Sequence, residues 1–582
     1  MIAKRNTGTL LIGLVILFIG LLWPLTAARA DEDQPLLTIS GYVRNTHGEG
    51  IADAELQVGM GGQSLEPRAG EHEVWRTDEE GAFLIRIPLS AEQVADLANP
   101  ETIVTVQAAM PTYATTRRAI PAAEIAQRNN GFYTSLDFTL VHIHNPAFWV
   151  ATVVLLATYV LISTEKLHRT VVALLGAAVL LFITYTLGTL NKDFFILSFQ
   201  QAIHCIDFNV IFLLMAMMIM VSITARTGVL QWLAVRAYAL AGGSEWKMAI
   251  LLVIATAILS ALLPNVTVVL LVVPVTVEIA FILQINPLPL LLPEVFAANL
   301  GGTATLIGDP PNLLVGSFAH FTFVDFLLNM APAVVVTMVA LIALMWLFYG
   351  RQFRRVPAEE AAALLAELKE RHQIADPALL RKCLLVGGAV IVLFMVQGFF
   401  QMEVSIPALI GMAVLLTWTR ADIVKELEDV EWPSLIFFLM LFIVVGAAEE
   451  VGLIQALADW VNGIAGGSLV VAILLVLWVS AFASMLIDNI PLTATMLPVV
   501  AFLTATVPGA QDKILYWALA FGACLGGNGT IVGAAPNIVA VGLAERVGYP
   551  ITFNAFLKKG LPVTIATLLI ATVWLLGMAM LR

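Results

Sequence analysis

Two glycine-rich segments of closely similar sequence interrupt apolar stretches of the chain. The first is Asn299-Leu-Gly-Gly-Thr-Ala-Thr-Leu-Ile-Gly-Asp-Pro-Pro-Asn312, and the second is Cys524-Leu-Gly-Gly-Asn-Gly-Thr-Ile-Val-Gly-Ala-Ala-Pro-Asn537. Glycine and proline break helices, and unwound backbone at membrane depth is tolerated only where protein or a watered cavity satisfies its N–H and C=O groups. Two such breaks, one in each half of the chain, predict the solute site of a transporter.

A second pair of breaks has the sequences Leu263-Pro-Asn-Val-Thr267 and Ile487-Asp-Asn-Ile-Pro491. Unwound turns expose carbonyl oxygens that can bind a cation, and the helix N-termini beyond them favour an anion. The alternative is that Asn, Pro and Gly only form packing kinks, which are common in membrane helices. Because the breaks are duplicated in equivalent positions, we favour an ion-binding site. The candidate residues are Asn265, Thr267, Gly301, Thr303, Thr305, Asp309, Asn312, Asp488, Asn489, Thr493, Asn528, Thr530 and Asn537.

Acidic residues within the apolar stretches are candidates for coupling transport to a cation. An acid at membrane depth costs about 2.5 to 3.5 kcal/mol unless it is paired or hydrated, so we expect Asp488 to couple transport to a proton or another cation. Asp309 precedes Pro310, which is the usual order of a helix N-cap and first residue, so a structural cap and a site residue both remain open. Glu278 and the pair Glu449–Glu450 are expected near helix ends, where water solvates them.

The composition is that of a polytopic membrane protein, since 59% of residues are hydrophobic and 12% are charged. The charged segment 351–382 has a helical Ala/Leu/Glu/Lys texture and is expected to be a cytoplasmic linker between two halves. We expect apolar spans near 147–164, 170–190, 207–226, 248–284, 287–317, 323–349, 383–400, 404–419, 434–450, 468–508, 513–541 and 560–581.

The N-terminal part differs from the rest. Residues 1–30 have basic residues, an apolar run and Ala28-Arg29-Ala30, which predicts a cleaved signal peptide, with an uncleaved anchor helix as the alternative. Residues 31–145 hold 17 Asp and Glu against 7 Arg and no Lys, and alternate apolar and polar residues in short runs. This pattern predicts a small antiparallel β-sandwich outside the cytoplasm.

Few other side chains suggest chemistry. His142 and His144 could be metal ligands, but without a third ligand nearby a structural or solvated role is expected. Three scattered cysteines predict no disulfide framework, and the acidic charge balance does not suggest nucleic-acid binding.

The two halves form an internal repeat. Asn265 pairs with Asn489 at an offset of 224 residues (489 − 265), as do Gly228 with Gly452, whereas the glycine-rich segments are offset by 225 (526 − 301). This register predicts repeat 1 over 146–350 and repeat 2 over 383–582. Basic residues in the short loop at Lys166 and Arg169, the linker and Lys558-Lys559 indicate the cytoplasmic side, so the repeats run in opposite directions.

The broken segments resemble the ion transporter superfamily with its citrate-transporter-like domain, and within it the P protein and arsenite permease branch. The likeness covers about 146–582, while Ile39–Arg44 and Thr77–Leu84 resemble carboxypeptidase regulatory-like domains. The superfamily resemblance implies a homodimer with re-entrant hairpins near 248–266 and 470–490, whose tips meet the turns at 301–312 and 526–537.

The hairpin tips depart from the related dicarboxylate transporters, in which Ser-Asn-Thr tips hold sodium and the substrate carboxylate. Here they read Pro264-Asn265-Val266 and Asp488-Asn489-Ile490, which argues against sodium–dicarboxylate symport. The P protein pattern would also have an acid before the first Asn, where this chain has Pro264.

The expected fold is therefore an all-α polytopic membrane protein with inverted repeats and re-entrant hairpins, preceded by a small all-β sandwich ectodomain. The expected function is secondary active transport of a small anion or oxyanion, such as arsenite or a carboxylate, coupled to or exchanged with H⁺ or Na⁺. The alternatives are a Na⁺/H⁺ antiporter and, from another class, a membrane-anchored ectodomain sensor. No H-E-x-x-H or G-x-S-x-G pattern indicates an enzyme.

The expected setting is the inner membrane of the cell, with residues 31–145 extracytoplasmic. The expected partners are the ion substrate, the lipid bilayer and a second copy of the chain. No cofactor or metal is expected beyond the coupling H⁺ or Na⁺, and the Na⁺ would bind at the same turns.

The inverted topology can be tested by labelling. A cysteine introduced at Asn191 should react with an impermeant thiol reagent added outside intact cells, whereas one at Glu370 should react only after permeabilisation, because the basic loops place these positions on opposite sides. Equal labelling of both positions in intact cells would contradict the topology.

Overall fold

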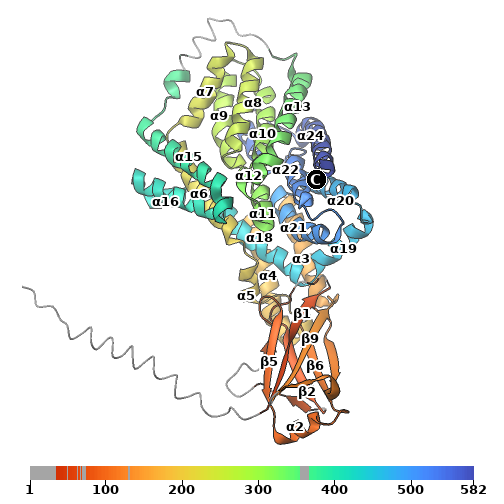
Figure 1. Cartoon of the computed structure of the whole chain (residues 1–582). Helices are drawn as coiled ribbons and strands as arrows, with labels where there is room; N and C mark the ends of the chain where they lie inside the picture. The colour runs from red at the N-terminus through yellow and green to blue at the C-terminus, as the bar shows by residue number, and fades with distance from the viewer. Residues whose placement is uncertain are drawn as a thin grey trace, which may run out of the picture. The chain divides into compact units, whose positions relative to one another are not determined.

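The computed structural model describes residues 35–581 apart from 47, 49, 62, 66, 68–73, 129–130, 165, 354–365 and 367. The chain forms two compact units, which divide between Ile143 and His144 (Figure 1). The predicted signal peptide or anchor at 1–30 and much of the predicted linker lie outside the described residues.

The first unit is a pair of packed β-sheets with one short helix. One sheet has the order β5-β1-β9-β8 and the other the order β3-β2-β6-β7, with β4 also paired to β2. The bounds are β1 (Leu36–Asn45), β2 (Glu55–Met60), β3 (Gln63–Leu65), β4 (Trp75–Arg76), β5 (Ala82–Pro88), α2 (Ala91–Leu97), β6 (Ile103–Ala109), β7 (Thr116–Pro121), η2 (Ala122–Glu124), β8 (Ala126–Arg128) and β9 (Gly131–Leu140).

This unit confirms the predicted sheet region and changes one detail of it. Alternate residues such as Leu37 and Ile39 of β1, and Leu56 and Val58 of β2, are buried in one core between the sheets. The strands pair antiparallel except β1 and β9, which run parallel over their whole length. The prediction of a purely antiparallel sandwich is therefore wrong, because alternation within a strand specifies its faces but not the direction of its neighbour.

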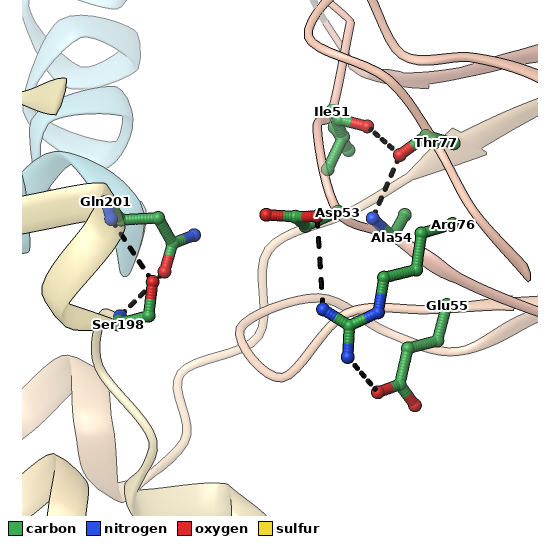
Figure 2. Close-up of polar contacts among 8 residues, drawn as sticks. All are labelled: Ile51, Asp53, Ala54, Glu55, Arg76, Thr77, Ser198 and Gln201. Carbon is green, nitrogen blue, oxygen red and sulfur yellow. Dashed lines mark hydrogen bonds and ion pairs between the residues drawn. The ribbon is translucent and has the colours of Figure 1, made fainter. Parts of the chain in front are cut away.

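Polar contacts close the turns of both units. The buried Thr77 hydroxyl donates to the Ile51 carbonyl at 2.6 Å and accepts from the Ala54 N–H at 2.9 Å (Figure 2). In the second unit, Ser198 and Gln201 form the capping box that begins α5, which Figure 2 also shows. The ring of His142 lies 3.8 Å from that of Tyr113, which supports the structural role expected for this histidine.

The second unit is helical. Among the described residues, nine helices are long and apolar enough to cross a membrane, or ten if the bent pair α11 and α12 is one span, which confirms a polytopic helical membrane protein. The helices are α3 (Pro146–Ser163), α4 (Arg169–Leu190), α5 (Phe199–His204), α6 (Phe208–Ala225), α7 (Val229–Ala241), α8 (Glu245–Ser260), α9 (Asn265–Ile282), α10 (Leu288–Thr303), α11 (Pro310–Ala319), α12 (Phe323–Asn329), α13 (Ala331–Tyr349), α15 (Pro377–Phe400), α16 (Ser405–Thr419), α17 (Ile423–Glu428), α18 (Trp432–Glu450), α19 (Leu453–Ala465), α20 (Leu469–Leu486), α21 (Asn489–Thr506), α22 (Ile514–Gly526), α23 (Ala535–Arg546) and α24 (Phe553–Leu581).

The four predicted breaks all separate helices. The long spans divide between α8 and α9, between α10 and α11, between α20 and α21, and between α22 and α23. Two short helices, α7 and α19, were missed because they lie between the apolar spans. Each begins after a glycine in the left-handed region, Gly228 with φ 74° and Gly452 with φ 82°, where a residue with a Cβ is strained.

The helix boundaries follow the predicted repeat. α8 and α20 begin 224 residues apart (469 − 245), as do α9 and α21 (489 − 265), whereas α11 and α23 begin 225 apart (535 − 310). The outer helices are exchanged between the halves, since α4 packs on α18 and α16 packs on α6. The Thr170 hydroxyl, for example, donates to the Pro433 carbonyl at 2.7 Å.

Glycines allow the hairpins to approach the broken helices. A Cβ on Gly301 of α10 would lie 2.2 Å from the Ala257 carbonyl oxygen of α8, and one on Gly526 of α22 would lie 2.4 Å from that of Ala481 in α20. The closest helix contacts of the two repeats thus depend on glycine at equivalent positions.

We expect Gly526→Ala to lower the thermal unfolding midpoint of the purified protein in detergent. The added methyl group overlaps backbone that cannot move away, and such overpacking costs about 1 to 3 kcal/mol. Gly388→Ala in α15 is the matched control, since nothing lies within 4 Å of its added Cβ. Equal midpoints for the two variants would show that the close contact is unimportant.

Candidate functional site

The first hairpin tip is built around Asn265, the first residue of α9. The hydroxyl of Ser260 donates to the side-chain oxygen of Asn265 and to the Ala298 carbonyl, the latter at 2.7 Å. A Cβ on Gly302 would lie 2.3 Å from the same Asn265 oxygen, so the amide rests directly on glycine backbone. Asn265 Nδ2 makes no hydrogen bond of normal geometry with a described residue. The tip therefore holds a fixed acceptor and an unused donor.

The second tip carries a charge that the first lacks. Asp488 Oδ1 accepts from the Ile490 N–H at 3.0 Å and so caps α21, while Oδ2 accepts from Arg169 Nη1 at 3.1 Å. The next residue, Asn489, donates from Nδ2 to Asp309 Oδ2 at 3.4 Å. Asp488 thus has both a capping role and an ionic one, whereas sequence analysis expected only the second.

Asp309 is not the helix cap that its place before Pro310 allows. It precedes α11, but its side chain accepts no hydrogen bond from the first N–H groups of that helix. The carboxylate is only 3% exposed and faces Asn489 from the opposite repeat. The structure therefore favours the site reading of Asp309 over the capping reading.

The glycine-rich turns are held by asparagine amides. Asn312 Nδ2 donates to the carbonyls of Gly302, Thr303 and Thr305 at 3.1, 3.2 and 2.8 Å. In repeat 2, Asn537 Nδ2 donates to the carbonyls of Gly527 and Thr530 at 2.7 and 2.8 Å. These bonds satisfy carbonyl groups that the unwound helices leave free.

Threonine hydroxyls join each turn to its hairpin. Thr305 donates to the Ala261 carbonyl and Thr530 to the Met485 carbonyl, both at 2.5 Å. Thr493 donates within α21 to the Asn489 carbonyl at 2.7 Å. These candidate residues therefore position the site through backbone contacts.

Two residues that sequence analysis did not select connect the repeats. Asn299 Nδ2 donates to the side-chain oxygens of Asn528 and Asn537 at 2.8 and 3.0 Å. Cys524, which occupies the equivalent position in repeat 2, donates from Sγ to Asn312 Oδ1 at 3.4 Å. Each glycine-rich helix thus contacts the asparagine that holds the opposite turn. The repeat register could have indicated these positions as a pair, but not their partners.

Two neighbouring cavities lie among these elements. The smaller, of about 50 Å³, is lined by Asn265, Thr267, Asp309 and Asn489. The larger, of about 320 Å³, is lined by His168, Glu431 and Asp488 together with apolar residues of α9 and α23. Arg169 lines both cavities.

Five of the thirteen candidates therefore line a cavity, and eight do not. The five are Asn265, Thr267, Asp309, Asp488 and Asn489. Of the others, Gly301 packs on Ala257, and seven take part in the turns or in helix bonding, namely Thr303, Thr305, Asn312, Thr493, Asn528, Thr530 and Asn537.

Arg169 is the main functional candidate that sequence analysis missed, because it was used there only to orient the loop. Besides Asp488, its guanidinium donates to the Ser434 hydroxyl at 3.0 Å and lies 5.3 Å from the centroid of the Phe437 ring. The two members of the ion pair are 319 residues apart, and no local pattern predicts that they meet.

Other acids lie away from the cavities. Glu278 is paired with Arg371 at 3.0 Å and with His372 at 2.8 Å, which replaces the expected solvation by ion pairing with the end of the linker. Glu294 of α10, which sequence analysis did not consider, is 1% exposed and accepts from the Thr276 hydroxyl at 2.8 Å.

The comparisons with known proteins agree with this architecture. The citrate transporter family, CitMHS, matches residues 159–522. An uncharacterized transporter of Mycobacterium tuberculosis is 41% identical over 429 residues, which cover 73% of this chain and 97% of that protein.

A more distant relative has the expected branch name. The P protein of Homo sapiens is 34% identical over 504 residues, which cover 73% of this chain and 59% of the P protein. Among solved structures, the Alcanivorax borkumensis YdaH transporter aligns with 70% of this chain and 98% of its own at 14% identity and a TM-score of 0.44. The matched family and the full-length transporter relatives show that this chain belongs to the CitMHS citrate transporter family.

Proposed function

We propose that this transporter moves a small anion through the cavities between its hairpin tips, together with H⁺ or Na⁺. One observation carries the proposal: the first residues of four helices, Asn265 of α9, Pro310 of α11, Asn489 of α21 and Ala535 of α23, line the same small cavity. Each helix N-terminus presents free N–H groups and a partial positive charge. Four of them around one cavity favour an anion.

The charged side chains support the same proposal. Among the described residues that line the two cavities, Arg169 is the single Lys or Arg, and it lines both of them. Asp309 and Asp488 are 3% and 6% exposed, so their charges must be balanced within the protein. An anion entering beside two acids therefore needs a cation with it, which is the basis for proposing coupling to H⁺ or Na⁺.

A Na⁺/H⁺ antiporter is the second candidate. The observation in its favour is the contact between Asp309 and Asn489, because carboxylate and amide oxygens together suit a hard cation. An antiporter would need no anion for turnover, whereas the anion transporter would.

We further propose that the protein works as a homodimer in the inner membrane of the cell, with the β-sheet unit outside the cytoplasm. This setting follows from the family resemblance and from the distribution of basic loops, and the labelling experiment at Asn191 and Glu370 tests the orientation.

Proteoliposomes containing the full-length protein can test the function. Uptake of citrate, succinate, inorganic phosphate and arsenite would be measured with and without imposed pH and Na⁺ gradients. Anion uptake that is accelerated by an inward H⁺ or Na⁺ gradient supports the proposal. Proton movement driven by Na⁺ without any of these solutes would instead favour the antiporter.

The asparagines at the hairpin tips should contribute directly to binding. We expect Asn265→Ala and Asn489→Ala each to raise the KM of the transported anion roughly tenfold, since one hydrogen bond to a charged group contributes about 1.5 to 3 kcal/mol. The unfolding midpoint should change little because both groups face a cavity. Asn554→Ala, an exposed asparagine of α24, is the control. An unchanged KM in both tip variants would remove the tips from the binding site.

Asp309→Asn separates a structural from a functional acid. Asparagine is about as good an N-cap as aspartate, so a purely structural residue predicts normal flux. Because Asp309 caps nothing in the structure and faces the cavity, we expect Asp309→Asn to fold normally and to lose most of its flux. Wild-type flux with an unaltered dependence on pH and Na⁺ would exclude Asp309 from the transport site.

A further inference from the structure

We propose that Arg169 is the residue that binds the substrate anion, and that Asp488 occupies the same guanidinium when the carrier is empty. Anion and Asp488 would then exchange on one cation, which makes an oxyanion the substrate class and links its binding to a coupling ion. This inference rests on the proposed function, and the experiment below separates the failure of one from that of the other.

The surroundings of Arg169 leave one of its partners replaceable. Ser434 and Phe437 of α18 hold the guanidinium, at 3.0 Å from the hydroxyl and 5.3 Å from the ring centroid. Asp488 belongs to the hairpin tip, a separate element, and contacts Arg169 through Nη1 alone at 3.1 Å. A guanidinium has five N–H donors, so Arg169 can bind an anion that enters from either cavity while it stays anchored to α18.

The partner also indicates what kind of anion fits. In the empty carrier the guanidinium holds a carboxylate, and a planar guanidinium matches two oxygens of a carboxylate or phosphate. A substrate that displaces Asp488 must present the same kind of oxygen. A carboxylate or a phosphate-like oxyanion qualifies, whereas arsenite, which is uncharged at neutral pH, does not. The adjoining cavity of about 320 Å³ gives such an anion room beside the pair.

Exchange on Arg169 creates a demand for a cation. The Asp488 side chain is 8% exposed, and a carboxylate that loses its counter-ion in such a place costs several kcal/mol. The other titratable side chains lining the two cavities within the described chain are His168, Glu431 and Asp309. Glu431 and Asp309 are acids and cannot compensate Asp488. A proton or sodium ion must therefore accompany the anion.

The exchange involves only one hairpin. Pro264 occupies in repeat 1 the position that Asp488 occupies in repeat 2, at the offset of 224 residues (488 − 264). The first tip thus has no acid to compete for a cation. The device is a property of the second tip and of the helix α4 that packs beside α18.

The proposal can be tested by anion uptake into proteoliposomes containing the full-length protein. The probes are citrate, succinate and inorganic phosphate, with arsenite as the uncharged control solute. The variants are Arg169→Gln, Arg169→Lys and Asp488→Asn, and the control is Arg236→Gln, an exposed arginine that lies over Trp232 in α7. Size-exclusion profiles and unfolding midpoints establish that each variant is folded.

We expect the two sides of the ion pair to respond in opposite directions. Arg169→Gln should raise the anion KM roughly 10- to 100-fold, the loss of one charge-assisted hydrogen bond or more, and Arg169→Lys should raise it less. Asp488→Asn keeps the cap of α21 but removes the competitor, so it should lower the KM and flatten the dependence of uptake on pH and Na⁺. If Arg169→Gln does not fold, Arg169→Lys and Asp488→Asn still give opposite shifts.

Four outcomes would overturn the inference. Wild-type uptake of an anion with an unchanged KM in Arg169→Gln and Arg169→Lys overturns the inference alone. An increased KM in Asp488→Asn identifies the pair as structural and has the same consequence. Wild-type uptake of arsenite only overturns the substrate class. No uptake of any probe by the wild-type protein overturns the proposed function, and the inference falls with it.

Discussion

The rest of the transport unit depends on keeping unwound backbone satisfied within a membrane-embedded core. Water is absent from the hydrocarbon, so each carbonyl released by a broken helix needs a partner from the protein. Asn312 and Asn537 provide it, and their amide nitrogens bind the carbonyls of both glycine-rich turns. Once the turns are fixed, the helices beyond them can direct their N-termini at a common cavity.

The same constraint explains why most candidate residues proved to be supporting groups. An asparagine whose amide nitrogen is used by three carbonyls has little capacity left for a solute, as at Asn312. The contacts of Asn299 and Cys524 then join each turn to the opposite repeat. The turns and the bonds between them form a scaffold, and the polar groups facing the cavities come from the hairpin tips, from Asp309 and from α4.

Sequence alone predicted the parts of this architecture that local patterns encode. Proline, glycine and asparagine located the four breaks, and the constant offset located the repeat, because these features depend on neighbouring residues. Contacts between distant segments leave no such trace. The pairing of Arg169 with Asp488, the parallel pairing of β1 with β9 and the orientation of Asp309 away from its own helix all depend on tertiary packing. The likeness of the N-terminal unit to carboxypeptidase regulatory-like domains remains a prediction.

The difference between Pro264 and Asp488 has a consequence for direction. In a carrier whose repeats exchange conformations, a site with identical tips would look the same from both sides of the membrane. Here one tip is charged and the other is not, so the inward-open and outward-open forms are chemically unequal. The half-saturation concentrations on the two sides then differ, while the accumulation ratio at equilibrium is still fixed by the driving gradient. Such a carrier is kinetically rectified, and a single substitution in an ancestral duplicated hairpin would suffice to produce the asymmetry.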